Sequence, residues 1–254
     1  MPTVKDIYDY INSIAPFDRQ NEWDNSGIAA GSFDTEVETA VFALDITADV
    51  VSFARENNAQ LVVSHHPVIF KARKRLMSND PAYMLANAGL SAICAHTSLD
   101  IAEGGVNDAL TEKLGFGRCP ALTGEGEAAM VRVYEFDEPH GIGEVAALTA
   151  KALETAVRYS DCGKPVKKVA VCGGAGCDFA PLCAESGCDL LITGDASHHD
   201  FLDGITEGIS IIAAGHYETE NPVVEALADA IKKEFGINTL VAPSSAPCQT
   251  TVWI

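Results

Sequence analysis

The sequence predicts an α/β protein of two similar lobes, related by an internal repeat, with a metal site between them. Short apolar runs bounded by turn residues are typical of buried parallel strands, and they lie at 61–63, 92–95, 169–172, 190–193 and 209–214. Six of the seven histidines directly follow such runs. Because ligands of open α/β sheets bind beyond the carboxyl ends of the strands, these histidines indicate a metal site at that edge.

The expected elements alternate along the chain between strands and helices. The opening helix is amphipathic with Thr3 as its cap, and the next one begins near Thr47. Helices are predicted over 3–15, 47–57, 80–88, 105–114, 142–154, 178–186 and 221–235. Strands are predicted over 40–44, 61–64, 91–95, 129–136, 168–172, 189–193 and 209–214. The stretch 117–127 is rich in Gly, Pro and Thr and is the expected boundary between the lobes.

Residues 41–67 superpose on 170–196 without a gap, at an offset of 129 positions. After a deletion of ten residues, 89–93 matches 208–212. Identities are few, so the match is one of pattern, and the alternative is that any two βαβ segments look alike. If the repeat is real, a single family domain over 1–254 holds one lobe at about 1–120 and another at about 128–240. A strand over 247–254 has no clear assignment.

Composition restricts the partners and the compartment. The 254 residues carry 17 basic and 36 acidic side chains, for a net charge of −19, which disfavours nucleic acid and anionic membrane surfaces. No apolar run approaches the roughly 18 residues of a membrane span. The first residues lack the basic and apolar regions of a signal peptide, so we expect a cytoplasmic protein.

Eight cysteines are present, and four of them lie between 172 and 188. Their spacing lacks the paired short knuckles of a zinc ribbon. We interpret them as small buried residues in a reducing compartment, and a redox or thiolate–metal role is the alternative.

The pair His65-His66 is the sharpest metal signal. Neighbouring strand residues point to opposite faces, so both imidazoles face one site only if the strand ends there, and Pro67 provides that end. Asp100 lies in a strand-exit loop where its carboxylate is able to bridge two cations. His216 and Glu220, four residues apart, share one face of a helical turn. The alternative for the histidine pair is an incidental polar pair.

Further polar residues at strand ends are interpreted as support for that site. Ligating imidazoles need an acceptor on their second nitrogen, and Asp45 and Asp195 end neighbouring strands. His96 and one of His198 and His199 are candidates to move protons. Each of these residues has a purely structural alternative.

A basic cluster follows the histidine pair. Its members are Lys71, Arg73, Lys74 and Arg75. They form either a solvated loop or an anion-binding site beside the metals, suited to phosphate groups. The run Gly173–Gly176 lacks a P-loop lysine and the Rossmann spacing, so a tight turn is favoured over a phosphate loop.

Taken together, these residues resemble the dinuclear-metal, hexamer-forming family of GTP cyclohydrolase 1 type 2 homologs, the NGG-interacting-factor family. The matching strings are Trp23-Asp24-Asn25-Ser26-Gly27, Ser64-His65-His66-Pro67, His96-Thr97 with Leu99-Asp100, Gly104-Gly105-Val106-Asn107-Asp108, Thr193-Gly194-Asp195 with His198-His199, and Gly215-His216 with Thr219-Glu220. The resemblance implies a two-metal centre held by His65, His66, Asp100, His216 and Glu220. It also implies a toroidal hexamer of two-lobed α/β/α subunits without the inserted domain of longer relatives.

The function expected is a dinuclear metal-dependent hydrolase, acting on a nucleotide or another anionic substrate. A cyclohydrolase of this kind opens the imidazole ring of guanine and releases formate. Mixed histidine and carboxylate ligands suit Zn, Fe, Mn, Ni or Co. The alternative is a non-enzymatic, metal-loaded hexameric ring that binds partners or handles metals. The apolar run 250–254 is expected to be an edge strand or part of a subunit contact.

Overall fold

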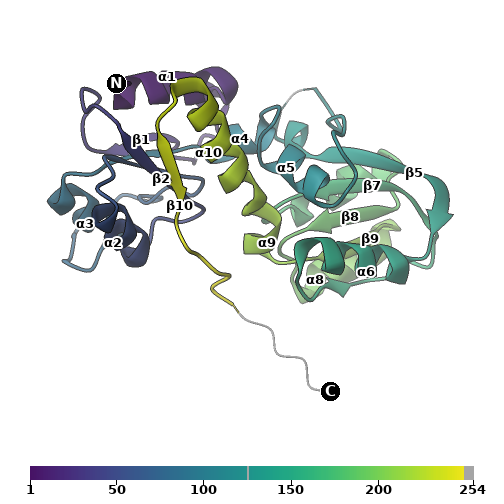
Figure 1. The fold of residues 1–254 in the computed structure, drawn as a ribbon. Coiled ribbons are helices and arrows are strands. Elements are labelled where there is room, and N and C mark those ends of the chain that lie inside the picture. Colours follow the sequence, from purple (N-terminus) through teal and green to yellow (C-terminus); the bar gives the residue numbers. More distant parts are fainter. Residues whose placement is uncertain (125, 249–254) are drawn as a thin grey trace. The chain divides into compact units, whose positions relative to one another are not determined.

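Two compact units make up the chain in the computed structural model, which describes residues 1–124 and 126–248. The first comprises Met1–Gly105 with Val223–Ser244, and the second Val106–Pro222 with the segment that starts at Ser245. Each holds one five-stranded sheet, so the predicted α/β class is confirmed. Figure 1 shows helices beside the strands of each unit. None of the helices in the described residues is long and apolar enough to span a membrane.

The first unit has the strand order β1-β4-β3-β2-β10, and only β1 runs antiparallel to its neighbour. Its helices are α1 (Val4–Ile14), η1 (Phe17–Arg19), α2 (Ala48–Glu56), α3 (Pro81–Ala88), α4 (Thr97–Ile101) and α10 (Pro222–Phe235). Its strands are β1 (Gly27–Ala30), β2 (Thr39–Ala43), β3 (Leu61–Ser64), β4 (Ser91–Cys94) and β10 (Asn238–Val241). Thr3 caps α1, as its sequence predicted, and the structure shows that it forms a capping box with Asp6.

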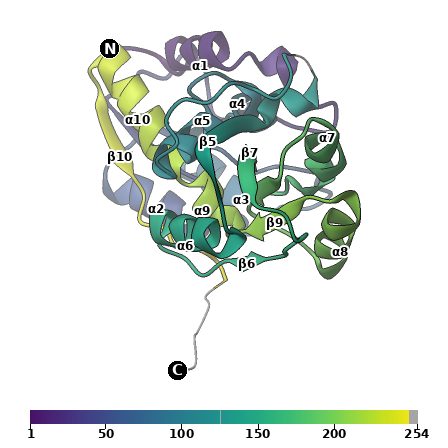
Figure 2. The ribbon, with the colours of Figure 1, turned by 90° about the vertical axis from the view of Figure 1, so that its right-hand side faces the viewer.

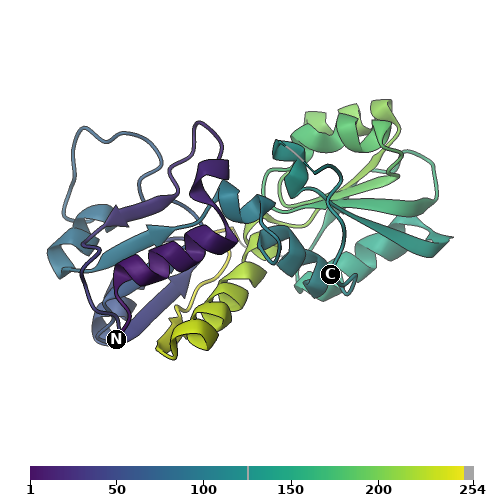
Figure 3. The ribbon, with the colours of Figure 1, turned by 90° about the horizontal axis from the view of Figure 1, so that it is seen from above.

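Both faces of this sheet are covered, because every residue of β2, β3 and β4 is buried. On one face, Val41 and Val62 pack against Val51 of α2 and Leu85 of α3. Figures 1 and 3 show α1 and α10 side by side, and the ring of Tyr10 lies 5.7 Å from that of Phe235. The sheet is therefore a buried platform, and its carboxyl edge is where polar side chains emerge.

The second unit has the strand order β5-β7-β8-β9-β6, with β7, β8 and β9 parallel. Its helices are α5 (Val106–Lys113), η2 (Glu127–Met130), α6 (Ile142–Leu153), η3 (Cys177–Phe179), α7 (Ala180–Glu185), α8 (His198–Glu207) and α9 (His216–Glu220). Its strands are β5 (Arg132–His140), β6 (Arg158–Tyr159), β7 (Val166–Cys172), β8 (Leu190–Thr193) and β9 (Ser210–Ala213). Figure 2 shows α6 on one side of the strands and α7 and α8 on the other.

The register of the strands agrees with the repeat in the sequence. Val41 lies opposite Val62 in the first sheet, and Ala170 lies opposite Leu191 in the second, which is the same pair displaced by 129 positions. The third strands agree as well, because Leu61 pairs with Ser91 and Leu190 pairs with Ser210. Residues 41–67 and 170–196 are thus equivalent βαβ segments with the same strand order and direction.

The units differ from the expected lobes at both boundaries. The first unit ends at Gly105 rather than near 120, because Leu110 and Leu114 join the core of the second unit. The segment Val223–Ser244 was expected in the second lobe, but it belongs to the first unit, where β10 pairs with β2. Of the expected C-terminal strand 247–254, residues 247 and 248 form a bend, and the predicted tail 250–254 lies outside the described residues.

Candidate metal centre

His65 and His66 leave the first sheet where β3 ends. Their backbone N–H groups donate to Ala43 O (3.3 Å) and Leu44 O (2.9 Å). The backbone pairing between β3 and β2 therefore continues for two residues past the end of β3. The hydroxyl of Ser64 donates to His66 O at 2.8 Å, which fixes the turn. This local turn allows two adjacent imidazoles to face the same region.

Three imidazoles gather at this edge, and an acceptor contacts Nδ1 of each. His65 Nδ1 lies 2.8 Å from Ala95 O, His66 Nδ1 lies 2.8 Å from Asp45 Oδ1, and His96 Nδ1 lies 2.8 Å from Asp24 Oδ1. A carbonyl or carboxylate partner places the proton on Nδ1, so Nε2 keeps its lone pair. His65, His66 and His96 offer ligand atoms within 4.8 Å of one another.

Asp24 holds His96, and it is not among the site residues predicted from the sequence. Its side chain is 0% exposed, and Oδ2 accepts from Thr97 N (3.0 Å) and from Thr97 Oγ1 (2.6 Å). Burial opposes its ionisation, but the hydrogen bonds from His96 and Thr97 outweigh burial and hold the pKa of Asp24 well below its usual range. Only its place in the string Trp23–Gly27 signalled a role.

Replacing Asp45 with asparagine is expected to lower the affinity for divalent metal about 10-fold, because His66, a predicted ligand, loses the carboxylate that orients its ring. Asp24→Asn provides the comparison, since Asp24 orients His96, which is not among the predicted ligands, and it should change metal affinity less than about twofold. Metal titration of both variants checks this order. An equal effect of the two substitutions would contradict it.

Asp100 brings a carboxylate to the same edge of the first unit. It lies on α4, the helix that begins directly after His96, and its Oδ1 is 3.6 Å from His65 Nε2. The side chain of His65 is 1% exposed and that of Asp100 is 14% exposed. An imidazole nitrogen and a carboxylate oxygen therefore face one another in a place with little water.

In the second unit, His216 opens α9 directly after β9 and contacts two carboxylates. Its Nδ1 lies 2.7 Å from Asp195 Oδ2, and its Nε2 lies 3.0 Å from Glu220 Oε2. The hydrogen bond to Glu220 is the main cause that raises the pKa of His216 to about 9, burial opposes it, and Asp195 adds to it. As with His66 and Asp45, the histidine lies 21 residues after its aspartate. The positions of Asp45 and Asp195 at strand ends predicted these carboxylate–histidine contacts.

A glycine loop makes room for Glu220. A Cβ on Gly174 would lie 2.1 Å from Glu220 Oε1, and the φ of +62° at this residue also favours glycine. The loop is held by Asn107, whose Oδ1 accepts from Gly173 N at 2.8 Å. The run Gly173–Gly176 bends at Gly174 and Ala175 and is supported by Asn107; the preference for a tight turn over a phosphate loop stays a prediction.

The remaining candidates lie on exposed segments. His198 and His199 are in the first turn of α8, and their ring centres are 5.5 Å apart. The basic cluster lies in the loop between β3 and α3, where Arg73 forms an ion pair with Asp80. Just before the cluster, Phe70 packs against Trp23, and each ring lies within 6.0 Å of His96. The roles of these residues stay predictions.

Five of the eight cysteines are buried, as the structural interpretation predicted, whereas Cys162 and Cys177 are half-buried and Cys248 is exposed. Within the cluster, Cys172, Cys183 and Cys188 are buried, and burial is the main cause that raises the pKa of Cys183 to about 12. A thiol of this kind is protonated at neutral pH and is a poor metal ligand. Among the described residues, no group of three or more metal-competent side chains includes a cysteine.

The donor set suits a divalent metal. In Zn, Fe, Mn, Ni and Co sites of proteins, the ligands are carboxylate oxygens and imidazole rings. A ligating ring commonly binds the metal through Nε2 while its Nδ1 is hydrogen-bonded. The first unit contributes His65, His66 and Asp100 of the predicted ligands, and the second contributes His216 and Glu220. Their convergence on one centre stays a prediction.

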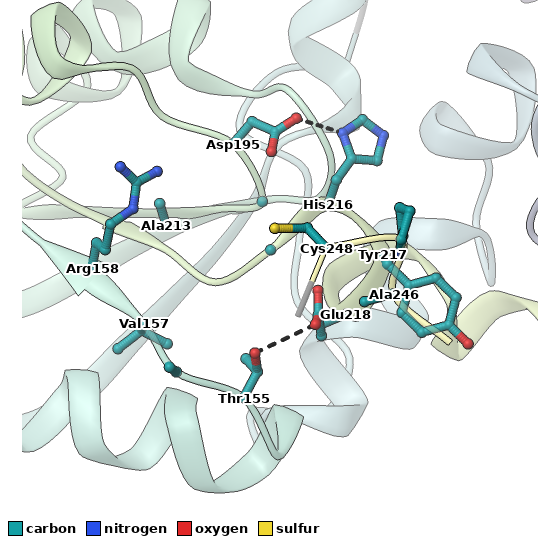
Figure 4. Close-up of a pocket in the computed structure, with 14 residues that line it drawn as sticks. Thr155, Val157, Arg158, Asp195, Ala213, His216, Tyr217, Glu218, Ala246 and Cys248 are labelled. Carbon is teal, nitrogen blue, oxygen red and sulfur yellow. Dashed lines mark hydrogen bonds and ion pairs between the residues drawn. The ribbon is translucent and has the colours of Figure 1, made fainter. Parts of the chain in front are cut away.

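A cavity of about 390 Å³ opens beside His216 in the second unit (Figure 4). Its wall includes Asp195 and Glu218 at the carboxyl edge of the sheet, and Thr155 and Arg158 at the start of β6. The size lies in the range of small-molecule sites, roughly 300–1,000 Å³. No local pattern in the sequence predicts this cavity, because its wall combines segments that are distant in the sequence.

By its fold and its histidines, this protein is an α/β protein with metal-competent side chains at the carboxyl ends of parallel strands. Residues 2–247 match the Duf34/NIF3 (NGG1p interacting factor 3) family, and the chain belongs to this family. It is 31% identical to a GTP cyclohydrolase 1 type 2 homolog from Clostridium acetobutylicum over 95% of each chain.

Solved structures agree with the fold. A hypothetical protein from Staphylococcus aureus has a TM-score of 0.90 at 24% identity and covers 99% of this chain and 100% of its own. A Bacillus cereus protein related to NIF3 has a TM-score of 0.87 at 19% identity, with coverage of 98% and 99%. These likenesses concern the fold alone.

Proposed function

We propose that this protein is a dinuclear metal-dependent hydrolase that acts on a nucleotide or another anionic substrate. The observation that carries the proposal is the set of three imidazoles whose Nδ1 atoms contact acceptors, while ligand atoms of the three lie within 4.8 Å of one another. The proposed ligands of two divalent ions are His65, His66, Asp100, His216 and Glu220. Bound metals of this kind supply a water of lowered pKa and neutralise charge on the reacting oxygens.

The side chains around the ligands have separate tasks in this proposal. Asp45 and Asp195 orient His66 and His216 through Nδ1. His96, held by buried Asp24, has the proposed task of receiving and returning a proton at Nε2, and His198 and His199 are further candidates for this task. The low exposure of His65 and Asp100 keeps bulk water from competing with substrate.

The substrate class is supported by two features. Curated relatives carry the name GTP cyclohydrolase 1 type 2 homolog, which points to a guanine nucleotide and to hydrolytic opening of its imidazole ring. Lys71, Lys74 and Arg75 add cationic charge just after Phe70, whose ring contacts His96. A charged loop beside a metal centre favours phosphate-bearing substrates.

The second candidate function is a metal-loaded homohexameric ring that binds partners or handles metals without catalysis. The observation in its favour is the apolar surface of α8, where Leu202 is 48% exposed and Ile205 is 45% exposed. Such side chains mark a contact surface when copies associate. Assembly in a ring is compatible with either function.

Metal analysis followed by a substrate screen tests the proposed function. We expect the purified protein to hold about two divalent ions per chain and to release formate from GTP or hydrolyse a phosphoester. Activity should fall with a chelator and return with the native metal. A protein that binds the metals but acts on no nucleotide or phosphoester would favour the non-enzymatic ring.

A further inference from the structure

Charged groups of both signs line the cavity beside His216 within the second unit: Arg158 is cationic, and Asp195 and Glu218 are anionic, with Asp195 hydrogen-bonded to His216. Arg158 and Glu218 both line it, and Figure 4 shows their charged groups apart from one another, with Asp195 and His216 at the same cavity. Val157 and Ala213 add apolar wall. A ligand that fits this lining carries an anionic group and a hydrogen-bond-donating group on an otherwise weakly polar body.

Arg158 is held in place and still has donors to offer. Its Nη2 donates to Ala196 O at 2.8 Å, and its guanidinium carbon lies 5.4 Å from the centre of the Phe201 ring. In the described part of the chain, no hydrogen bond engages Nε or Nη1 and no carboxylate pairs with Arg158. A fixed guanidinium with free N–H groups is suited to bind phosphate or carboxylate.

Glu218 is also held in place. The φ of Gly215 is +90°, and a Cβ there would lie 2.1 Å from Glu218 Oε2, so glycine allows the carboxylate to fold back over the start of α9. Thr155 Oγ1 donates to Glu218 Oε1 over a long 3.4 Å, as the dashed line in Figure 4 marks. Oε2 therefore keeps its capacity to accept from a ligand.

We propose that this cavity binds a ligand of nucleotide size, with its phosphate on Arg158 and a nitrogen-bearing donor edge on Glu218. A guanine base has such an edge, since its ring N–H and amino group both donate. The inference rests on the proposed function in that it takes the ligand to be the substrate of the same centre. It adds a binding site and two specificity-determining residues outside the metal ligands.

Calorimetric titration with GMP and with guanosine tests the proposal on the protein as purified, with metal content and melting temperature measured for every variant. Arg158→Gln is expected to weaken GMP binding about 10–100-fold and guanosine binding less than about twofold, because a charged hydrogen bond is lost only with the phosphate. The affinity of Arg158→Lys for GMP should lie between those of the wild type and Arg158→Gln, since lysine keeps the charge without the planar fork.

Glu218→Gln should weaken the binding of GMP and of guanosine alike. Lys151→Gln, on an exposed part of α6 in the same unit, removes one charge outside the cavity and should change neither.

A structural role of Arg158 would affect GMP and guanosine equally, and that result would overturn the proposal, as would unchanged GMP binding. The outcome is separable from the proposed function. A wild-type protein without metal contradicts the dinuclear hydrolase, whereas a selective loss of GMP binding in Arg158→Gln still supports the cavity. Normal metal content with no binding of GMP or guanosine overturns the cavity and leaves the metal centre standing.

Discussion

Alanine variants of His65 and His216 are each expected to lose more than about 100-fold in affinity for divalent metal. Removal of a partner outside the ligands typically costs about 10–100-fold, and removal of a direct ligand costs more. His65 comes from the first unit and His216 from the second, so a large effect of both variants is what one shared centre requires. Metal titration with a competing chelator measures the loss.

The double variant of His65 and His216 decides between one centre and two. Losses at sites that share no partner add in free energy, whereas losses within one connected site do not. We expect the double variant to bind metal only slightly more weakly than either single one. Additive losses would instead assign each unit its own metal site.

His140→Ala is the control for this series. Its side chain lies at the end of β5, is 43% exposed and contacts Glu144 only weakly, at 3.5 Å. It belongs to none of the proposed sets, so its removal should leave metal affinity within about twofold.

The parallel cores of both units were predictable because apolar runs of buried strands are local signals. All four residues of β3, β4, β8 and β9 are buried, and the repeat gave the correct register of these strands. The histidines at their ends were predictable for the same reason. A strand end places the next side chains at the sheet edge whatever the rest of the chain does.

The elements that sequence reasoning missed lack such a signal. Residues of β10 are exposed or half-buried, and β6 has only two residues, so neither has an apolar run. The helix α8 was missed although Ser197 and Asp200 form a capping box at its start. Asp24 contacts Thr97 and His96 across more than 70 positions, which no local pattern encodes.

A buried ion pair fixes the start of the second unit. Asp108 on α5 and Arg132 on β5 contact one another, and their side chains are only 6% and 4% exposed. Arg132 Nη1 also donates to Ala129 O at 2.7 Å, so the guanidinium connects α5, β5 and the turn before β5. This pair acts together with the packing of Leu110 and Leu114 to keep α5 with the second unit.

Arg132→Met is expected to lower the free energy of unfolding by about 3–5 kcal/mol, because it leaves the Asp108 carboxylate buried without its guanidinium. Adding Asp108→Leu should recover much of that loss, since two apolar side chains then replace the two charges. Urea denaturation measures both variants. Lys5→Met breaks the exposed pair with Asp9, whose side chains are 53% and 52% exposed, and should cost no more than about 1 kcal/mol. If Arg132→Met is as mild as Lys5→Met, water reaches the Asp108 carboxylate, and the position of α5 depends on Leu110 and Leu114 instead.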